Sequence, residues 1–120
     1  PDYRGVMASF RALLAGETEL GTTLHYIRDA GIDTGGIIAT SAMLVDRNKS
    51  YLWHVLNLYS DGCQLIIEAV NAIAEDRPVT DNPQIAGGEY FSFPTEADYA
   101  TFAQAGLTLF NETEALPLPN

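Results

Sequence analysis

The residues of this sequence best suited to chemistry gather around one glycine-rich segment, residues 28–36. His25 precedes the segment, and Asp29 and Asp33 lie within it. A histidine beside two carboxylates can act as an acid–base group, and glycines let a planar ligand contact the backbone of a loop. Spacing alone also fits a purely structural role, because aspartates commonly stabilise turns through hydrogen bonds to the backbone.

Other polar side chains are weaker candidates. His54 lies off the apolar stripe of a long predicted helix, which predicts a solvated side chain. Cys63 is the one cysteine, which excludes an internal disulfide and a multi-cysteine zinc site, and its apolar neighbours predict a buried structural thiol. The two histidines lack metal-ligand spacing, so no metal is expected. Aromatic residues in segment 90–93 could line a pocket or pack in a core.

The composition predicts one acidic domain. The chain has 120 residues, and 16 acidic against 6 basic side chains give a net charge of -10. Because nucleic-acid affinity depends on Lys and Arg that neutralise phosphates, no nucleic-acid partner is expected. No signal peptide is visible, and the apolar segments are too short to span a bilayer, so we expect a cytoplasmic protein without a membrane partner.

Periodicity and turn residues predict the elements that position the glycine-rich segment. A helix is expected over residues 6–15, and strands over 22–27 and 37–45 should pair as a long-looped hairpin. The second strand is almost entirely apolar or small, which predicts burial on both faces. A long helix should begin at its N-cap Ser50 and end near residue 76, with apolar residues at Leu52, Leu56, Tyr59, Cys63, Ile66, Ile67, Val70 and Ala74.

Shorter elements follow the long helix. A strand or extended segment is expected over residues 89–93. Thr95 should cap a last helix, with Asp98 completing a capping box. Residues 111–120 are expected to form a frayed acidic tail.

The segment GTTLHYIRDAGIDTGGII, residues 21–38, resembles the folate-dependent formyltransferase family. That family includes methionyl-tRNA, glycinamide ribonucleotide and sugar N-formyltransferases. Its pattern is a strand of the form G-V-T-h-H-h-h followed by D-x-G-h-D-x-G-x-I, which is matched here by Gly21, His25, Asp29, Gly31, Asp33, Gly35 and Ile37. Residues 1–5 are similar to the family's L-P-x-Y-R-G loop and residues 15–21 to its G-E-x-x-x-G helix exit, whereas Gly36 departs from the Pro or Asp of many members.

The resemblance implies an α/β fold, namely the C-terminal half of a Rossmann-like formyltransferase domain over residues 1–110. The implied cofactor is N10-formyltetrahydrofolate, whose pterin would be held by Arg28, Asp29, Ala30, Gly31, Ile32 and Asp33. Asp33 matches the family's catalytic aspartate, and His25 would support it. Tyr3 and Arg4 are expected to contact a small-molecule amine, and the acidic charge favours an amino-sugar nucleotide over tRNA.

The resemblance also predicts impaired activity for this chain. The family's catalytic Asn and His belong to an N-x-H-x-S-x-L-P segment whose last proline matches Pro1. Since each oxyanion donor contributes on the order of 3 kcal/mol to transition-state stabilisation, a poor or inactive formyltransferase is expected. An exposed sheet edge and apolar helix faces predict a homodimer, a swapped assembly or an N-terminal partner. A non-catalytic self-associating module and a formyl hydrolase remain open alternatives.

Overall fold

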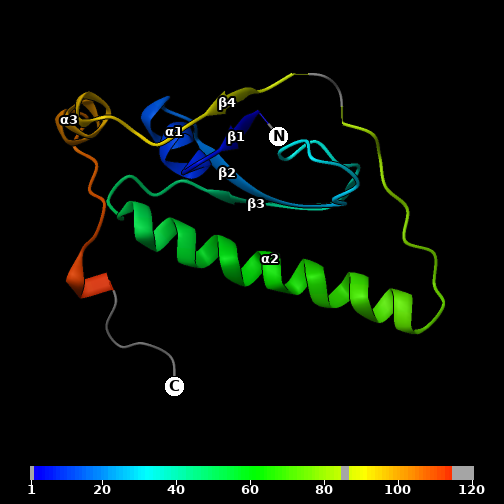
Figure 1. Cartoon of the computed structure of the whole chain (residues 1–120). Helices are drawn as coiled ribbons and strands as arrows, with labels where there is room; N and C mark the ends of the chain where they lie inside the picture. The colour runs from blue at the N-terminus through cyan, green and yellow to red at the C-terminus, as the bar shows by residue number, and fades with distance from the viewer. Residues whose placement is uncertain (1, 85–86, 115–120) are drawn as a thin grey trace.

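An antiparallel hairpin organises the computed structural model, which describes residues 2–84 and 87–114 (Figure 1). Strands β2 (Glu19–His25) and β3 (Ile37–Leu44) pair along their whole length, with an irregularity between Leu24 and His25. The predicted long-looped hairpin is confirmed. The first strand begins at Glu19, earlier than expected, because residues 19–21 pair with residues 42–44 and extend the ladder.

A second strand pair is short and parallel. β1 (Tyr3–Gly5) pairs with β4 (Glu89–Phe91), although more than 80 residues separate them in the sequence. The sequence predicts β4 but gives no signal for β1, because three residues are too few to show alternation. Together with the helices, this mixture of parallel and antiparallel strands confirms the predicted α/β class.

The core lies between two short helices, strand β2 and the long helix. Helix α1 (Ala8–Leu14) starts later than predicted because Met7 adopts a left-handed conformation with a φ of 54°. The Phe10 ring is fully buried and stacks on Phe102 of α3 (Glu96–Gln104) at a centroid distance of 4.5 Å. The buried cluster consists of Phe10, Ala12, Leu13, Leu20, Leu58, Phe102 and Leu107.

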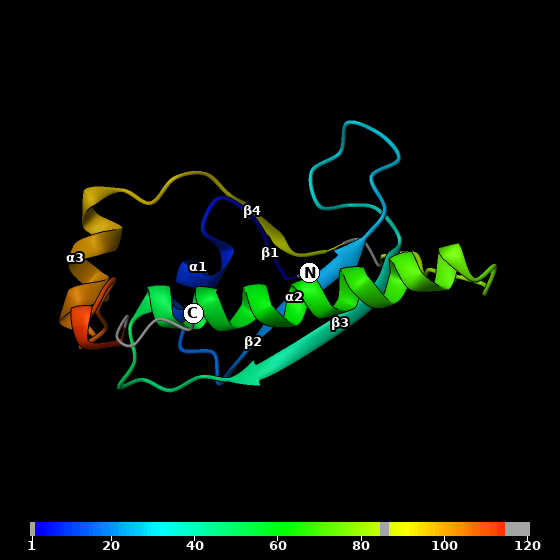
Figure 2. The same cartoon turned by 90° about the horizontal axis from the view of Figure 1, so that it is seen from below.

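Helix α2 (Tyr51–Ala74) runs along one face of the hairpin (Figure 2). The predicted N-cap is confirmed, since the Ser50 hydroxyl accepts a hydrogen bond from the Trp53 N–H at 3.1 Å. Gly62 permits close packing on β2, because a Cβ there would lie 3.2 Å from the hydroxyl oxygen of Thr22. Among the helices of the described residues, none is long and apolar enough to cross a membrane.

The apolar stripe predicted for α2 is largely exposed. The side that packs on the hairpin instead contains the buried residues His54, Leu58 and Ala72. We call the exposed stripe the outer apolar face; it comprises Leu56, Tyr59, Ile66, Ile67, Val70 and Ile73, whose exposed fractions run from 50% to 66%. The expectation that the chain exposes an apolar helix face is therefore confirmed.

Three burial predictions are wrong for related reasons. His54 is fully buried and not solvated, because its ring satisfies backbone groups beside the N-terminus of α2. Cys63 is exposed and not a buried thiol, because its apolar neighbours belong to the outer apolar face. Strand β3 is not buried on both faces; α2 packs against the hairpin from one side, and Leu44 is exposed.

The last described elements are held by specific caps. The predicted capping box is confirmed, with Thr95 N–H donating to Asp98 Oδ2 at 2.7 Å and Asp98 N–H donating to the Thr95 hydroxyl at 3.2 Å.

The predicted acidic tail begins with a 3₁₀ turn, η1 (Glu112–Glu114). The Glu114 carboxylate accepts hydrogen bonds from the backbone and hydroxyl of Ser50, so this turn is anchored and not frayed. Residues 115–120 lie outside the described residues, and the extent of the tail stays a prediction.

Candidate functional site

The glycine-rich loop projects from the end of the hairpin between β2 and β3 (Figure 2). A hydrogen bond from the Tyr26 N–H to the Gly36 carbonyl oxygen closes its base at 3.0 Å. The backbone of Gly35 passes so close that a Cβ there would lie 1.5 Å from the Tyr26 carbonyl oxygen. The narrow base therefore requires glycine at position 35.

The tip of the loop is open to solvent. Asp29 Oδ1 accepts a hydrogen bond from the Gly31 N–H at 2.7 Å, so this carboxylate shapes the turn. Residues 27–32 are all exposed, and the apolar side chain of Ile32 is 52% exposed. An exposed backbone beside an apolar side chain offers both polar and flat contacts to a ring-shaped ligand.

Asp33 connects the loop to two strands. It adopts a left-handed conformation with a φ of 55°, and its side chain is 38% exposed. Oδ2 accepts a hydrogen bond from the Gly5 N–H of β1 at 3.1 Å, and Oδ1 lies 3.6 Å from Nε2 of His25 on β2. The expected proximity of His25 and Asp33 is present, whereas the contact with Gly5 was not predicted.

The His25 ring is oriented by its other nitrogen. Nδ1 lies 3.0 Å from the Tyr26 carbonyl oxygen, which can only accept, so we assign the proton of a neutral ring to Nδ1. Nε2 then faces Asp33 with a free lone pair, and it becomes a cationic partner when the ring gains a second proton. Nε2 and Oδ1 are 3.6 Å apart, which is beyond hydrogen-bond distance, so the imidazole and the carboxylate are near neighbours that are not hydrogen-bonded.

Arg28 is held beside the loop and away from its tip. Its guanidinium lies 4.8 Å from the centre of the Tyr26 ring and pairs with Asp81 Oδ1 at 3.3 Å. Its predicted part in holding a cofactor stays a prediction.

Tyr3 and Arg4 do not converge on one position. They are neighbours on β1, so their side chains point to opposite faces. The Tyr3 hydroxyl donates to Glu17 Oε1 at 2.8 Å, and this hydrogen bond to a carboxylate raises the pKa of Tyr3. Arg4 Nη2 donates to the Gly88 carbonyl oxygen at 3.4 Å. Their predicted contact with a substrate stays a prediction.

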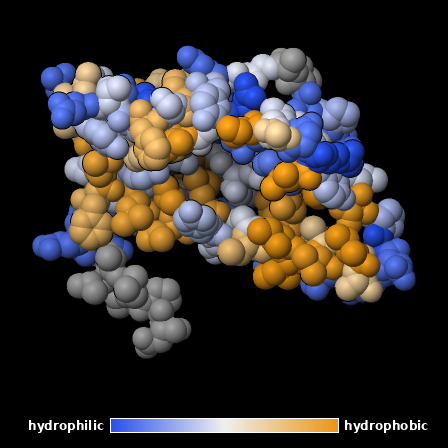
Figure 3. Space-filling view, in the orientation of Figure 1, coloured by the Kyte–Doolittle hydropathy of each residue, from blue (hydrophilic) through white to orange (hydrophobic). Residues whose placement is uncertain are grey.

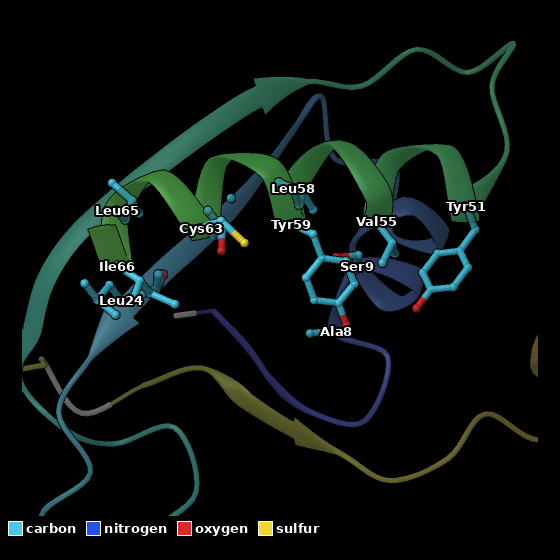
Figure 4. A pocket seen from close by; sticks show the side chains of 14 residues that line it. Ala8, Ser9, Leu24, Tyr51, Val55, Leu58, Tyr59, Cys63, Leu65 and Ile66 are labelled. Carbon is cyan, nitrogen blue, oxygen red and sulfur yellow. The ribbon is translucent and has the colours of Figure 1, made fainter. Parts of the chain in front are cut away.

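A groove lies apart from the loop, between α1, β2 and α2 (Figure 4). It has a volume of about 410 Å³ and is mostly apolar, with Tyr51, Tyr59, Cys63 and Ile66 among its lining residues. None of residues 28–33 lines it. Tyr59 and Ile66 also belong to the outer apolar face, so the groove and that face form one continuous surface. Sequence reasoning missed the groove because it arises only from the packing of separate elements.

Among residues 2–84 and 87–114, no group of three or more His, Cys, Asp or Glu side chains is arranged to hold a metal ion.

Comparisons with known proteins agree on one family. Residues 1–57 match the family described as formyl transferase. Methionyl-tRNA formyltransferase of Paramagnetospirillum magneticum is 33% identical over 88 residues, which is 73% of this chain and 28% of that protein. An N-formyltransferase from Helicobacter canadensis, solved with folinic acid and dTDP-3-aminofucose, superposes with a TM-score of 0.69 and 32% identity over 82% of this chain and 35% of its own.

A further solved structure extends the likeness. The formyltransferase PseJ from Anoxybacillus kamchatkensis was solved with UDP-4,6-dideoxy-4-formamido-L-AltNAc and tetrahydrofolate. It superposes with a TM-score of 0.72 and 25% identity over 88% of this chain and 55% of its own.

The mixed strands and helices, with the solved structures that superpose on them, thus define a protein of the Rossmann-like α/β class. This chain belongs to the formyltransferase family. It spans 28% of the length of the Paramagnetospirillum relative. The family and the fold inferred from residues 21–38 are therefore confirmed.

Proposed function

We propose that this chain takes part in formyl transfer from N10-formyltetrahydrofolate to the amine of an amino-sugar nucleotide. Residues 28–33 would hold the pterin ring, and Asp33 would be the carboxylate that handles the proton. The observation that carries this proposal is the position of Asp33, which has one oxygen on the Gly5 N–H and the other facing the His25 ring.

The loop has features that suit a folate. Its exposed backbone from residue 27 to residue 32 can exchange hydrogen bonds with a pterin edge, and Ile32 can lie against the ring face. The Helicobacter relative was solved with folinic acid and the Anoxybacillus relative with tetrahydrofolate, which supports the same class of cofactor here. When bound, such a cofactor supplies the formyl group.

Formyl transfer to an amine requires a group that accepts a proton. An amine that attacks the formyl carbon must lose a proton before the new amide is neutral. The Asp33 carboxylate can accept it, and Nε2 of His25 lies 3.6 Å from Oδ1 of that carboxylate. The Gly5 N–H keeps the carboxylate in place during this exchange.

The choice of substrate follows from charge. A net charge of -10 opposes a tRNA, because its phosphates would meet few basic side chains. The Helicobacter and Anoxybacillus relatives were solved with sugar nucleotides, which supports a small amine substrate. The match covers 28% of the Paramagnetospirillum relative and 35% of the Helicobacter relative, so we propose that these 120 residues alone are inactive or impaired. A cytoplasmic location stays part of this proposal.

Binding of a folate tests the loop assignment. Folinic acid, a stable formylated folate, is titrated calorimetrically into the chain, into Asp33→Asn and into Asp76→Asn. Asp76 is a matched control because it is exposed and has a similar φ of 53°. We expect Asp33→Asn to weaken binding about tenfold, the effect of one hydrogen bond or charge contact, while Asp76→Asn leaves it unchanged. No binding by the unmodified chain would overturn the pterin-loop assignment.

Activity tests the proton role. In the longest natural protein that contains this sequence, Asp33→Asn should lower kcat by roughly 10²- to 10⁴-fold, as loss of a general acid–base group does. The same change at Asp76 should leave kcat unaffected. Equal activities of the two variants would contradict the role of Asp33.

A non-catalytic, self-associating module is the second candidate. The outer apolar face of α2 and the continuous groove beside it favour association, since exposed patches of this kind mark interaction sites. Folate binding separates the two candidates, because a module that has lost the chemistry has no need to keep the loop competent.

A further inference from the structure

A short segment after α2, residues 81–84, returns along the base of the glycine-rich loop; we call it the strap. Asn82 forms an isolated antiparallel bridge with Ile37, in which each backbone N–H donates to the other carbonyl oxygen at 2.8 Å. The Gln84 side chain reaches across and donates from Nε2 to the Gly35 carbonyl oxygen at 2.5 Å. In Figure 1 this part of the chain passes the side of the molecule that carries the loop.

The strap contacts the loop at both of its ends. Asp81 pairs with Arg28 at the start of the loop, with Oδ1 and Nη2 separated by 3.3 Å. At the other end Asp81 presses on Gly36, where a Cβ would lie 1.7 Å from Oδ2. The strap therefore accounts for the glycine at 36, the position at which this chain departs from the Pro or Asp of many family members.

These contacts hold the part of the loop from which Asp33 projects. Asp33 lies two residues before Gly35, and its left-handed backbone depends on its neighbours to stay in place. Within the loop the backbone is tied by the Tyr26–Gly36 hydrogen bond at the base and by the turn at Asp29. The Gln84 amide adds a tie at Gly35, between that base and Asp33.

From this arrangement we infer that Gln84 is a positioning residue, which keeps the Asp33 carboxylate on Gly5 and His25 through its hydrogen bond to Gly35. The importance of the Asp33 carboxylate for catalysis rests on the proposed function. Whether Gln84 holds that carboxylate in place can be measured independently of any activity. The ion pair of Asp81 with Arg28 contributes less, because the Arg28 side chain is largely exposed and such pairs are weak.

The test replaces the donor without changing the size of the side chain. Gln84→Glu removes the N–H that faces Gly35. Gln64→Glu makes the same change on α2, where Gln64 donates a hydrogen bond to the exposed Glu68. Amide hydrogen exchange by NMR is measured at Gly5, whose N–H reports on Asp33, and at the core residues Leu13 and Leu58.

We expect exchange at Gly5 to accelerate about tenfold in Gln84→Glu, as for the loss of one hydrogen bond, with the core amides unchanged. A merely structural role would accelerate the core amides as well. Unchanged exchange at Gly5, or equal acceleration at all three positions, would overturn the inference.

Folate binding then separates this inference from the proposed function. If the unmodified chain binds folinic acid, Gln84→Glu should weaken binding about tenfold and Gln64→Glu should not. If binding is absent but Gly5 still responds, the proposed function fails and the positioning role stands. If binding is present and Gln84→Glu leaves both binding and Gly5 unchanged, the positioning role fails alone.

Discussion

His54 is a polar side chain that the core retains because both of its ring nitrogens have backbone partners. Nδ1 donates to the Ser50 carbonyl oxygen at 2.7 Å, and Nε2 accepts from the Asp46 N–H at 3.1 Å. The neutral ring thus links the turn after β3 to the first turn of α2. A buried polar group that is fully paired in this way costs little, whereas an orphaned partner costs a good deal.

Replacing this ring should destabilise the fold strongly. His54→Leu leaves the half-buried Asp46 N–H and the Ser50 carbonyl oxygen without the ring nitrogens that pair with them, and we expect the free energy of unfolding to fall by about 2–4 kcal/mol. Asn57→Leu is the matched control, because Asn57 is exposed on the same helix and should change stability by less than about 0.5 kcal/mol. Urea unfolding followed by circular dichroism measures both, and equal losses would refute the structural role of His54.

Residues whose roles depend on near neighbours in sequence could be predicted, and residues that depend on distant partners could not. His25 and Asp33 flank one loop, so their proximity follows from the hairpin. The contact of Asp33 with Gly5 depends on β1, and that of Gln84 with Gly35 depends on how the chain returns after α2. Periodicity also treats every histidine as polar, which hid the burial of His54.

At the scale of elements, helix ends were predictable and packing faces were not. Caps are local, so Ser50 and Thr95 identify their helices from sequence alone. Helix α2, however, is apolar on more than one side, and periodicity cannot choose which side packs. The choice is made by the hairpin, which contacts the side of Leu58 and leaves the outer apolar face free.

The start of α3 gives an acid-dependent contribution to stability. The pKa of the Asp98 carboxyl lies below its usual value of 3.8, first because the Thr95 N–H donates to it and further because Arg11 lies 3.0 Å away. A lowered folded pKa stabilises the fold above the unfolded value, and this gain is lost as the pH falls through the folded pKa. Asp98→Asn should therefore be less stable than the unmodified chain at pH 7, and the difference should shrink below about pH 4.

The measurement compares urea unfolding at a series of pH values from 7 downward. Glu96→Gln removes one charge from the same turn and corrects for the change in net charge. A difference between Asp98→Asn and the unmodified chain that does not vary with pH would show that the carboxylate has no part in stabilising α3.

At the scale of the whole molecule, the outer apolar face and the adjoining groove dominate one side (Figure 3). A helix of 24 residues is about 36 Å long, and the outer apolar face extends along much of α2, so it forms a long exposed apolar band. Water contact with such a band is unfavourable by about 25 cal/mol for each Å². In a solution of the purified chain, a second copy can cover it.

We therefore predict that the purified chain self-associates at about 100 µM, a concentration at which a dimer of even 10 µM Kd is mostly formed. Ile66→Lys combined with Val70→Lys places two charges in the middle of the band and should shift the chain to a monomer, because the charges would lose their hydration on association. Sedimentation velocity measures the change.

Gln64→Lys combined with Glu68→Lys is the control on exposed polar positions of the same helix and should leave association intact. If the unmodified chain is monomeric at this concentration, the outer apolar face does not mediate self-association. A different polypeptide would then be the expected partner of α2.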